Sequence, residues 1–226
     1  MPVSIALDGP SGAGKSTIAK AVAERIGAMY LDTGAMYRTV GLHMVRRGVS
    51  LADTAAVVAE LPSVRVRVAY EDGRQQMYLG EENVSEAIRA HEISAAASAV
   101  SAIPAVRRAL VPVQREIAGG VDIIVDGRDI GTVVLPDASV KIFLTADPAV
   151  RAQRRRDQLI EKNGAENVPP LEQILEDIIQ RDYNDTHRED SPLKKAEDAV
   201  EIDTTAMDIE TCTAKIVELA EQARSK

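Results

Sequence analysis

A glycine-rich segment near the N-terminus has the composition and spacing of a phosphate-binding loop. Residues 9–16 read GPSGAGKS, the pattern G-x-x-x-x-G-K-S, between an apolar run and a stretch of helical periodicity. Glycines in such a loop let backbone N–H groups converge on phosphate oxygens, and the helix that follows favours negative charge at its start. We expect bound phosphates to contact Gly9, Pro10, Ser11, Gly12, Ala13, Gly14, Lys15, Ser16 and Thr17. The alternative is a tight strand-to-helix turn whose glycines serve only packing.

Three polar residues around this loop could carry out phosphoryl transfer. Lys15 is expected to reach the β- and γ-phosphates as a catalytic residue, and the Ser16 hydroxyl to bind Mg²⁺. Asp126 ends the apolar segment VDIIVD, where phosphate-loop enzymes often place an acid toward the metal. We therefore expect Ser16 and Asp126 to be the metal ligands. The alternative for Asp126 is an acid that simply ends a strand.

Charged residues further along the chain could bind a second substrate. On a helix over 171–188, Arg181, Asp185 and Arg188 lie along one stripe that begins with apolar residues. The arginines could hold a phosphate or a base edge, and Asp185 a ribose hydroxyl, as the acceptor pocket of a small-molecule kinase requires. A solvated helix face with ordinary ion pairs is the alternative.

A cluster of four arginines at 151, 154, 155 and 156 indicates a lid. It precedes a flexible-looking connection that ends in two prolines, at 169 and 170. Because residues three and four apart share a helix face, we expect the segment 151–170 to close over a triphosphate, with Arg154 and Arg155 acting in catalysis. Salt bridges on a solvated helix are the alternative.

Apolar runs of strand length alternate with helical patterns along most of the chain. They lie at 3–7, 29–31, 121–125, 140–144 and 199–202, and they predict an α/β fold with a parallel sheet covered by helices. Residues 64–70 read VRVRVAY, and this strict alternation, followed by the turn residues EDGR, predicts a hairpin. Two helices are expected next. We expect one core domain over 1–41 and 119–226, with an inserted lobe over 42–118.

Composition narrows the class of protein. The 226 residues are 45% hydrophobic and 27% charged with a net charge of -8, which favours a globular domain over a membrane span or a general nucleic-acid binder. The single cysteine, Cys212, permits no intrachain disulfide. We expect a cytoplasmic monomer that binds neither nucleic acid nor membrane.

Five segments together resemble the bacterial cytidylate kinases of the nucleoside monophosphate kinase family. They are DGPSGAGKST at 8–17, LDTGAMYR at 31–38, ASAVSAIPAVR at 97–107, DGRDIGTVVLPDASVKIFL at 126–144, and RDYNDTHRED with SPL at 181–193. The resemblance implies a P-loop NTPase-type three-layer fold with five parallel strands, a monophosphate-binding lobe containing a small antiparallel sheet, and a short helical lid. It also implies transfer of the ATP γ-phosphate to CMP or dCMP, with Mg²⁺ required.

The same resemblance assigns an acceptor-phosphate site by position. Thr33, Arg38 and Arg128 are expected at the acceptor phosphate, and Arg128 is also expected to act in catalysis. The three polar residues of the 181–188 stripe are expected to complete the site around sugar, phosphate and base.

Cytosine recognition is assigned in the same way. Ser98, Arg107 and Asp129 are expected to read the base, whose exocyclic amine donates and whose ring nitrogen and carbonyl accept. Two rival functions stay open from the residues alone. One is a P-loop kinase for UMP, AMP or a small hydroxyl compound, and the other is a regulatory module that binds nucleotide without transfer.

Overall fold

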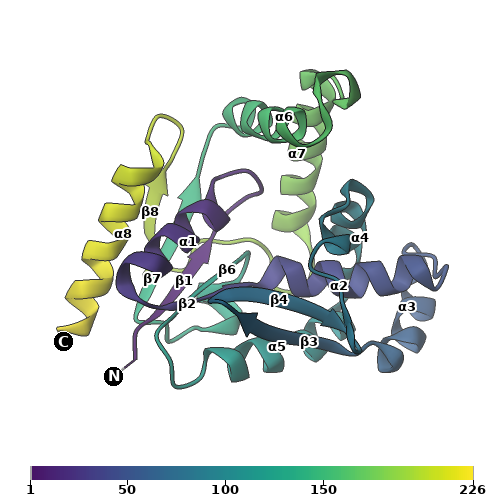
Figure 1. The fold of residues 1–226 in the computed structure, drawn as a ribbon, viewed down its shortest axis with the longest axis horizontal. Helices are drawn as coiled ribbons and strands as arrows, with labels where there is room; N and C mark the ends of the chain where they lie inside the picture. The colour runs from purple at the N-terminus through teal and green to yellow at the C-terminus, as the bar shows by residue number, and fades with distance from the viewer. Residues whose placement is uncertain (1, 226) are drawn as a thin grey trace.

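A computed structural model of the protein describes residues 2–225, and its centre is a sheet of five parallel strands (Figure 1). The strand order is β2-β6-β1-β7-β8. The strands are β1 Ser4–Asp8, β2 Met29–Asp32, β6 Ile123–Gly127, β7 Val140–Thr145 and β8 Val200–Asp203. β6 is buried along its whole length and β1 nearly so, which explains their continuous apolar runs. The predicted α/β fold with five parallel strands is confirmed.

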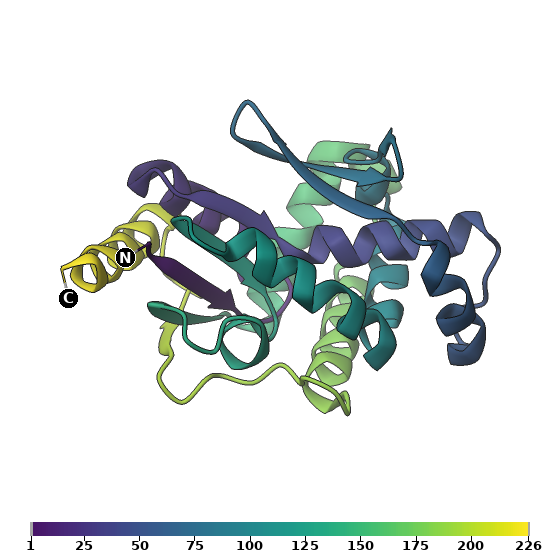
Figure 2. The same cartoon turned by 90° about the horizontal axis from the view of Figure 1, so that it is seen from below.

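Helices cover both faces of this sheet. α1 (Lys15–Ile26) and α8 (Ile209–Arg224) share a hydrophobic core with β1, β7 and β8 on one face. α2 (Thr33–Arg46) and α5 (Pro104–Ala118) contribute to a second core on the other face. Figure 2 shows α5 lying across this second face. The predicted three layers are therefore present.

The part of the sequence between β2 and β6 forms a small antiparallel sheet. It contains β3 (Val66–Glu71), β4 (Arg74–Leu79) and β5 (Glu82–Asn83), in that order. The predicted hairpin is confirmed, and its turn residues Asp72 and Gly73 both have positive φ, at 50° and 73°. The remaining elements of this segment are α3 (Thr54–Glu60), η1 (Leu61–Ser63), η2 (Ala87–Arg89) and α4 (His91–Ser101). α2 runs without a break across residue 42, where we expected the inserted lobe to begin.

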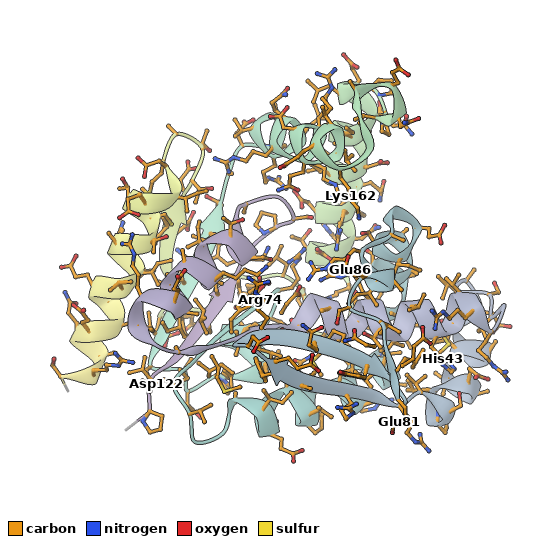
Figure 3. All side chains as sticks on the ribbon, in the orientation of Figure 1. His43, Arg74, Glu81, Glu86, Asp122 and Lys162 are labelled. Carbon is orange, nitrogen blue, oxygen red and sulfur yellow. The ribbon has the colours of Figure 1, made fainter. Side chains whose placement is uncertain are left out.

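Two helices form the segment that follows β7, and in Figure 1 the first lies across the top of the molecule while the second runs down from it. They are α6 (Pro148–Asn163) and α7 (Leu171–His187), joined through η4 (Ala165–Asn167). Ala152, Leu159, Ile174 and Ile178 give this pair a small core of its own. Lys162, labelled in Figure 3, donates to the carbonyl of Arg89 at 3.3 Å, so α6 touches the inserted segment.

Within residues 2–225, no single helix is both long and apolar enough to span a membrane. The segments Glu92–Ser101 and Pro104–Ala118 reach that length and composition only when taken together, across a bend of 96°. Both segments contribute to the hydrophobic core beside the sheet, for example through Val100 and Val106.

Candidate active site

The phosphate loop is a turn between β1 and α1 that only glycine permits at key points. Gly9 has φ +148°, and a Cβ there would lie 2.1 Å from the carbonyl oxygen of Leu144 on β7. Gly14, the residue before α1, has φ +91°. The loop therefore runs close over the end of β7 and delivers backbone N–H groups at the start of the helix.

Lys15 lies at the base of this loop among other cations. Its Nζ donates to the carbonyl of Pro10 at 2.8 Å, and the residue is only 6% exposed. Burial, and then the charges of Arg128 and Arg181, lower the pKa of Lys15 to about 7. Positive groups from three separate segments thus converge on one place, and this arrangement suits a polyanionic ligand.

Asp126 is buried near the carboxyl end of β6, and its side chain links the phosphate loop to β2 through hydrogen bonds. Its Oδ2 accepts from the Ser16 hydroxyl at 2.7 Å and from the Tyr30 hydroxyl at 2.9 Å. Its backbone carbonyl accepts from the Thr33 hydroxyl at 2.8 Å. Burial, and then repulsion from Asp32, raise the pKa of this carboxyl. A hydroxyl and a carboxylate oxygen in contact form a donor set that Mg²⁺ accepts.

Arg181 and Asp185 on α7, and Arg188 directly after the helix, lie near the loop that follows β6. Arg128 donates from Nε to Asp185 Oδ2 at 2.8 Å. Burial alone would raise the pKa of Asp185, but Arg128 and Arg181 hold it below its usual value. Burial, and then the charge of Arg128, lower the pKa of Arg181 to about 10, and its buried Nε has no hydrogen-bond partner within residues 2–225. The structure therefore brings Arg128, Arg181 and Asp185 together beside Lys15.

Arg38 lies on α2 and pairs with Asp32 at the carboxyl end of β2. Its guanidinium contacts Asp32 Oδ2 at 2.6 Å. The other oxygen of Asp32 accepts from the backbone N–H of Ala35 at 2.9 Å, so Asp32 also caps α2. The expected acceptor-phosphate residues Thr33 and Arg38 are therefore both placed by the start of one helix.

A buried ion-pair network forms a second polar centre. Arg107 pairs with Asp129 Oδ2, and Arg188 lies 3.4 Å from Asp129 Oδ1. The Arg107 guanidinium stands over the ring of Tyr37, at 5.7 Å from its centroid. Burial raises the pKa of Asp129 in spite of both arginines. Ser98 lies half-buried on α4, and no hydrogen bond from its hydroxyl is found within the described part of the chain.

The lid arginines divide into different environments. Arg154 donates to the carbonyl of Thr204 at 2.6 Å, and the Thr204 hydroxyl donates to the carbonyl of Ala13 in the phosphate loop at 3.0 Å. Burial, and then the charge of Arg38, lower the pKa of Arg155, so this guanidinium lies near Arg38. The two arginines therefore have different neighbours.

Asp8, and Arg151 of the expected lid, were given no individual role from the sequence, yet both are central to the geometry of the site. Asp8 accepts from the N–H groups of Ile130 and Gly131, both at 2.7 Å, and so holds the loop that carries Arg128. Arg151 donates to the carbonyl of Ser11 at 3.0 Å and pairs with Asp182 at 2.5 Å. Each contact joins segments far apart in the sequence, and only the position of Asp8 directly before Gly9 gave a local signal.

The family model that matches this chain and three of its curated relatives carry the same family name. A family model described as cytidylate kinase matches residues 5–222. The cytidylate kinase of Mycolicibacterium paratuberculosis is 50% identical over 206 residues, which cover 91% of this chain and 89% of the relative. The cytidylate kinase of Lactobacillus gasseri is 46% identical over 220 residues, covering 97% and 94%. That of Caldicellulosiruptor bescii is 46% identical over 217 residues, covering 96% and 95%.

Solved structures share the fold at low sequence identity. A gluconokinase from Sinorhizobium meliloti superposes with a TM-score of 0.51 at 15% identity, covering 99% of this chain and 95% of that one. A shikimate kinase from Bacteroides thetaiotaomicron gives a TM-score of 0.50 at 15% identity, covering 97% and 98%. These likenesses agree with the predicted P-loop kinase fold.

Proposed function

The chain belongs to the cytidylate kinase family, and we propose that it transfers the γ-phosphate of ATP to CMP or dCMP, forming ADP and CDP or dCDP. The observation that carries this proposal is the convergence of Lys15, Arg128 and Arg181 on one place, where burial, and then the charges of the two arginines, lower the pKa of Lys15. Phosphoryl transfer needs little covalent chemistry from the protein, so positioning and charge stabilisation are what a site must supply. This cluster supplies both.

The donor side is formed by the phosphate loop. Residues 9–17 bind the phosphates of ATP through backbone N–H groups, and Lys15 exchanges its contact with Pro10 for the phosphate oxygens. Arg154 lies on this side, whereas Arg155 faces the acceptor. Both arginines, together with Arg128, stabilise charge that develops on the transferring group.

Ser16 and Asp126 are the residues that would hold Mg²⁺. Their oxygens are already 2.7 Å apart, which fits a hard cation that prefers oxygen ligands. No cluster of three or more His, Cys, Asp or Glu side chains suited to a metal is found in residues 2–225. This agrees with a cation held by one or two protein oxygens and by the phosphates of the nucleotide. Bound there, Mg²⁺ would neutralise charge on the β- and γ-phosphates.

The acceptor side extends from Thr33 to the buried Arg107–Asp129 pair. Thr33, Arg38 and Arg128 bind the acceptor phosphate, and Arg181, Asp185 and Arg188, on α7 and at its C-terminal end, contact phosphate, sugar and base. Ser98, Arg107 and Asp129 read the cytosine. An acid and an arginine side by side match a base edge that carries both a donor and acceptors.

The arrangement of segments supports a closing cleft. We assign residues 1–41 and 119–226 to the core, 42–118 to the monophosphate-binding lobe and about 151–170 to the lid. Closure of lobe and lid excludes water, which would otherwise accept the phosphoryl group. We propose that the protein works as a cytoplasmic monomer and binds neither nucleic acid nor membrane.

A single mixing experiment tests the function. The protein is combined with MgATP and, separately, with CMP, dCMP, UMP and AMP, and the formation of ADP is followed. We expect the largest kcat/KM with CMP or dCMP, a smaller one with UMP, and the smallest with AMP. A preference for AMP would show that the acceptor is AMP and not a cytidine nucleotide. Binding of ATP without ADP formation from any acceptor would favour a regulatory module.

A further inference from the structure

β2 is an edge strand of the main sheet, and its free edge is bound by side chains of the β3–β4 hairpin. β2 pairs only with β6. Met29 directs its N–H toward the β6 side, to the carbonyl of Asp122 at 2.8 Å. Because successive residues of a strand direct their backbone groups to opposite edges, Tyr30 and Asp32 direct theirs to the free edge. These two residues are where the hairpin makes contact.

Gln75 and Tyr70 make these contacts. The N–H of Asp32 donates to Gln75 Oε1 at 2.7 Å, and Gln75 Nε2 donates to the carbonyl of Asp32 at 3.2 Å. The Tyr70 hydroxyl donates to the carbonyl of Tyr30 at 3.0 Å. Tyr70 and Gln75 are also direct cross-strand partners in the hairpin. In Figure 3 the label of Arg74 marks the neighbouring end of the hairpin, which points toward β2 and away from α3.

We propose that Gln75 and Tyr70 are positioning residues of the acceptor-phosphate site, which hold the end of β2 so that Asp32 orients Arg38. The inference rests on the proposed function, because it takes Arg38 as a ligand of the acceptor phosphate. Asp32 is the link: its backbone is held by Gln75, its Oδ2 pairs with Arg38, and its Oδ1 caps α2. The small sheet thereby helps to position Arg38, although the sheet itself lies outside the acceptor-phosphate site.

The energetic argument follows from the burial of Asp32. This residue is 7% exposed, so its backbone N–H depends on Gln75 rather than on water. The Asp32 carbonyl also begins the hydrogen bonds of α2, as N-cap carbonyls do. Removal of the Gln75 amide therefore leaves the Asp32 N–H unpaired next to the helix cap. The Asp32 side chain can then shift, and Arg38 loses its fixed place. Burial raises the pKa of Tyr70 to about 12, so its hydroxyl is a neutral donor across the working pH range.

The hairpin offers matched control residues. Gln76, next to Gln75, accepts from Ser85 Oγ at 2.8 Å and from the Asn83 amide at 3.3 Å, both within the inserted segment. Tyr78 donates to Glu71 at 2.6 Å, also within the hairpin. Gln76→Ala and Tyr78→Phe therefore make the same chemical changes in the same small sheet without touching β2.

The kinetic test compares the variants with MgATP and CMP. Gln75→Ala is expected to raise KM for CMP about tenfold, and Tyr70→Phe about threefold, as expected for lost hydrogen bonds. KM for ATP and the thermal midpoint should change no more than in Gln76→Ala and Tyr78→Phe. An increase in KM for CMP that is the same in Gln75→Ala and Gln76→Ala overturns the proposal, as does an equal loss for both substrates.

Amide hydrogen exchange, followed by NMR without nucleotide, tests the contact independently of activity. Exchange at the Asp32 N–H should accelerate about tenfold in Gln75→Ala, since this N–H loses its acceptor, and should be unchanged in Gln76→Ala. Unchanged exchange at Asp32 in Gln75→Ala overturns the proposal. If the wild-type protein formed no ADP with CMP, the proposed function would be wrong, whereas exchange at Asp32 would still decide whether Gln75 holds β2.

Discussion

Arg107 and Asp129 form an ion pair whose side chains are only 3% and 6% exposed. A buried pair of this kind contributes little net stability, because desolvation of both charges offsets their attraction. Removal of one partner is costly, since the other charge remains buried. Such a pair is therefore better explained by recognition of a ligand than by stability.

Truncation of Arg107 should separate the two nucleotide sites. Arg107→Ala is expected to lower kcat/KM for CMP by roughly ten- to a hundredfold, because a charged hydrogen-bonding group that reads the base is lost. KM for ATP should stay nearly unchanged. Kinetics with CMP, dCMP, UMP and AMP check this, with circular dichroism to establish that the variant is folded. Equal losses for all four acceptors would contradict a role in reading cytosine.

Replacement of Lys15 should abolish chemistry rather than folding. Lys15→Ala is expected to lower kcat by about a hundred- to a thousandfold, because a positive charge opposite the transferring phosphoryl group is removed. Lys20→Ala, a change at an exposed lysine of the same helix, is the control. A folded Lys15→Ala variant with wild-type kcat would remove this residue from catalysis.

Asp8 should give the stability of the protein a measurable pH dependence. Burial raises its pKa from 3.8 to about 6. Between these values the folded protein holds a proton that the unfolded chain has released, so the contribution of Asp8 to the free energy of unfolding falls as pH rises. The full fall is about 3 kcal/mol, from about two pKa units.

Urea titrations of the wild type and of Asp8→Asn between pH 4 and 7 check this sign. The wild-type advantage over the variant should shrink between pH 4 and 6 and then stay constant. A constant advantage would show that Asp8 ionises at an ordinary pKa, and a growing one would show that its amide contacts outweigh burial and lower the pKa.

Arg151 should couple the lid to the phosphate loop. Arg151→Ala removes the contacts with Ser11 and Asp182, and we expect KM for ATP to rise about tenfold while KM for CMP changes less. Arg156→Ala is the matched control, since Arg156 lies on the same helix and makes no ion pair within residues 2–225. Similar kinetics for the two variants would reject the coupling.

Closure should be visible in hydrogen exchange. With ATP and CMP together, we expect slower exchange over 151–170 and in the β3–β4 hairpin, whereas α8 should not respond. The contact between Lys162 and Arg89 lies where the two segments that we expect to move meet. Exchange that is indifferent to both ligands together would argue against closure.

The local parts of the site could be predicted from the sequence. Loop residues 9–17 follow from glycine spacing, and the order of strands and helices follows from apolar periodicity. The end of β6 was misplaced because apolar character does not reveal pairing. Gly127 belongs to the strand since it pairs with Asp8, although a glycine has no side chain that could indicate a strand.

The contacts between distant segments could not be predicted in this way. Nothing near Arg151 in the sequence indicates Ser11 or Asp182 as partners, and Asp8 meets Ile130 only through the tertiary fold. Gln75 looks like an ordinary hairpin residue until β2 is placed beside it. Such residues act through geometry that the chain creates only when folded.

The central place of β1 in the sheet has a consequence for biosynthesis. β1 pairs only with β6 and β7, so Ser4 cannot pair until Ile123 has been synthesised, and Ile5 cannot pair on its other side until Val140 has been synthesised. During translation the backbone N–H and C=O groups along both of its edges lack their strand partners while more than half of the chain is made, and pairings so distant in sequence form slowly. The helices and hairpin of residues 33–118 have local partners and can form earlier. The phosphate loop is therefore the first part of the site to leave the ribosome and one of the last to take shape.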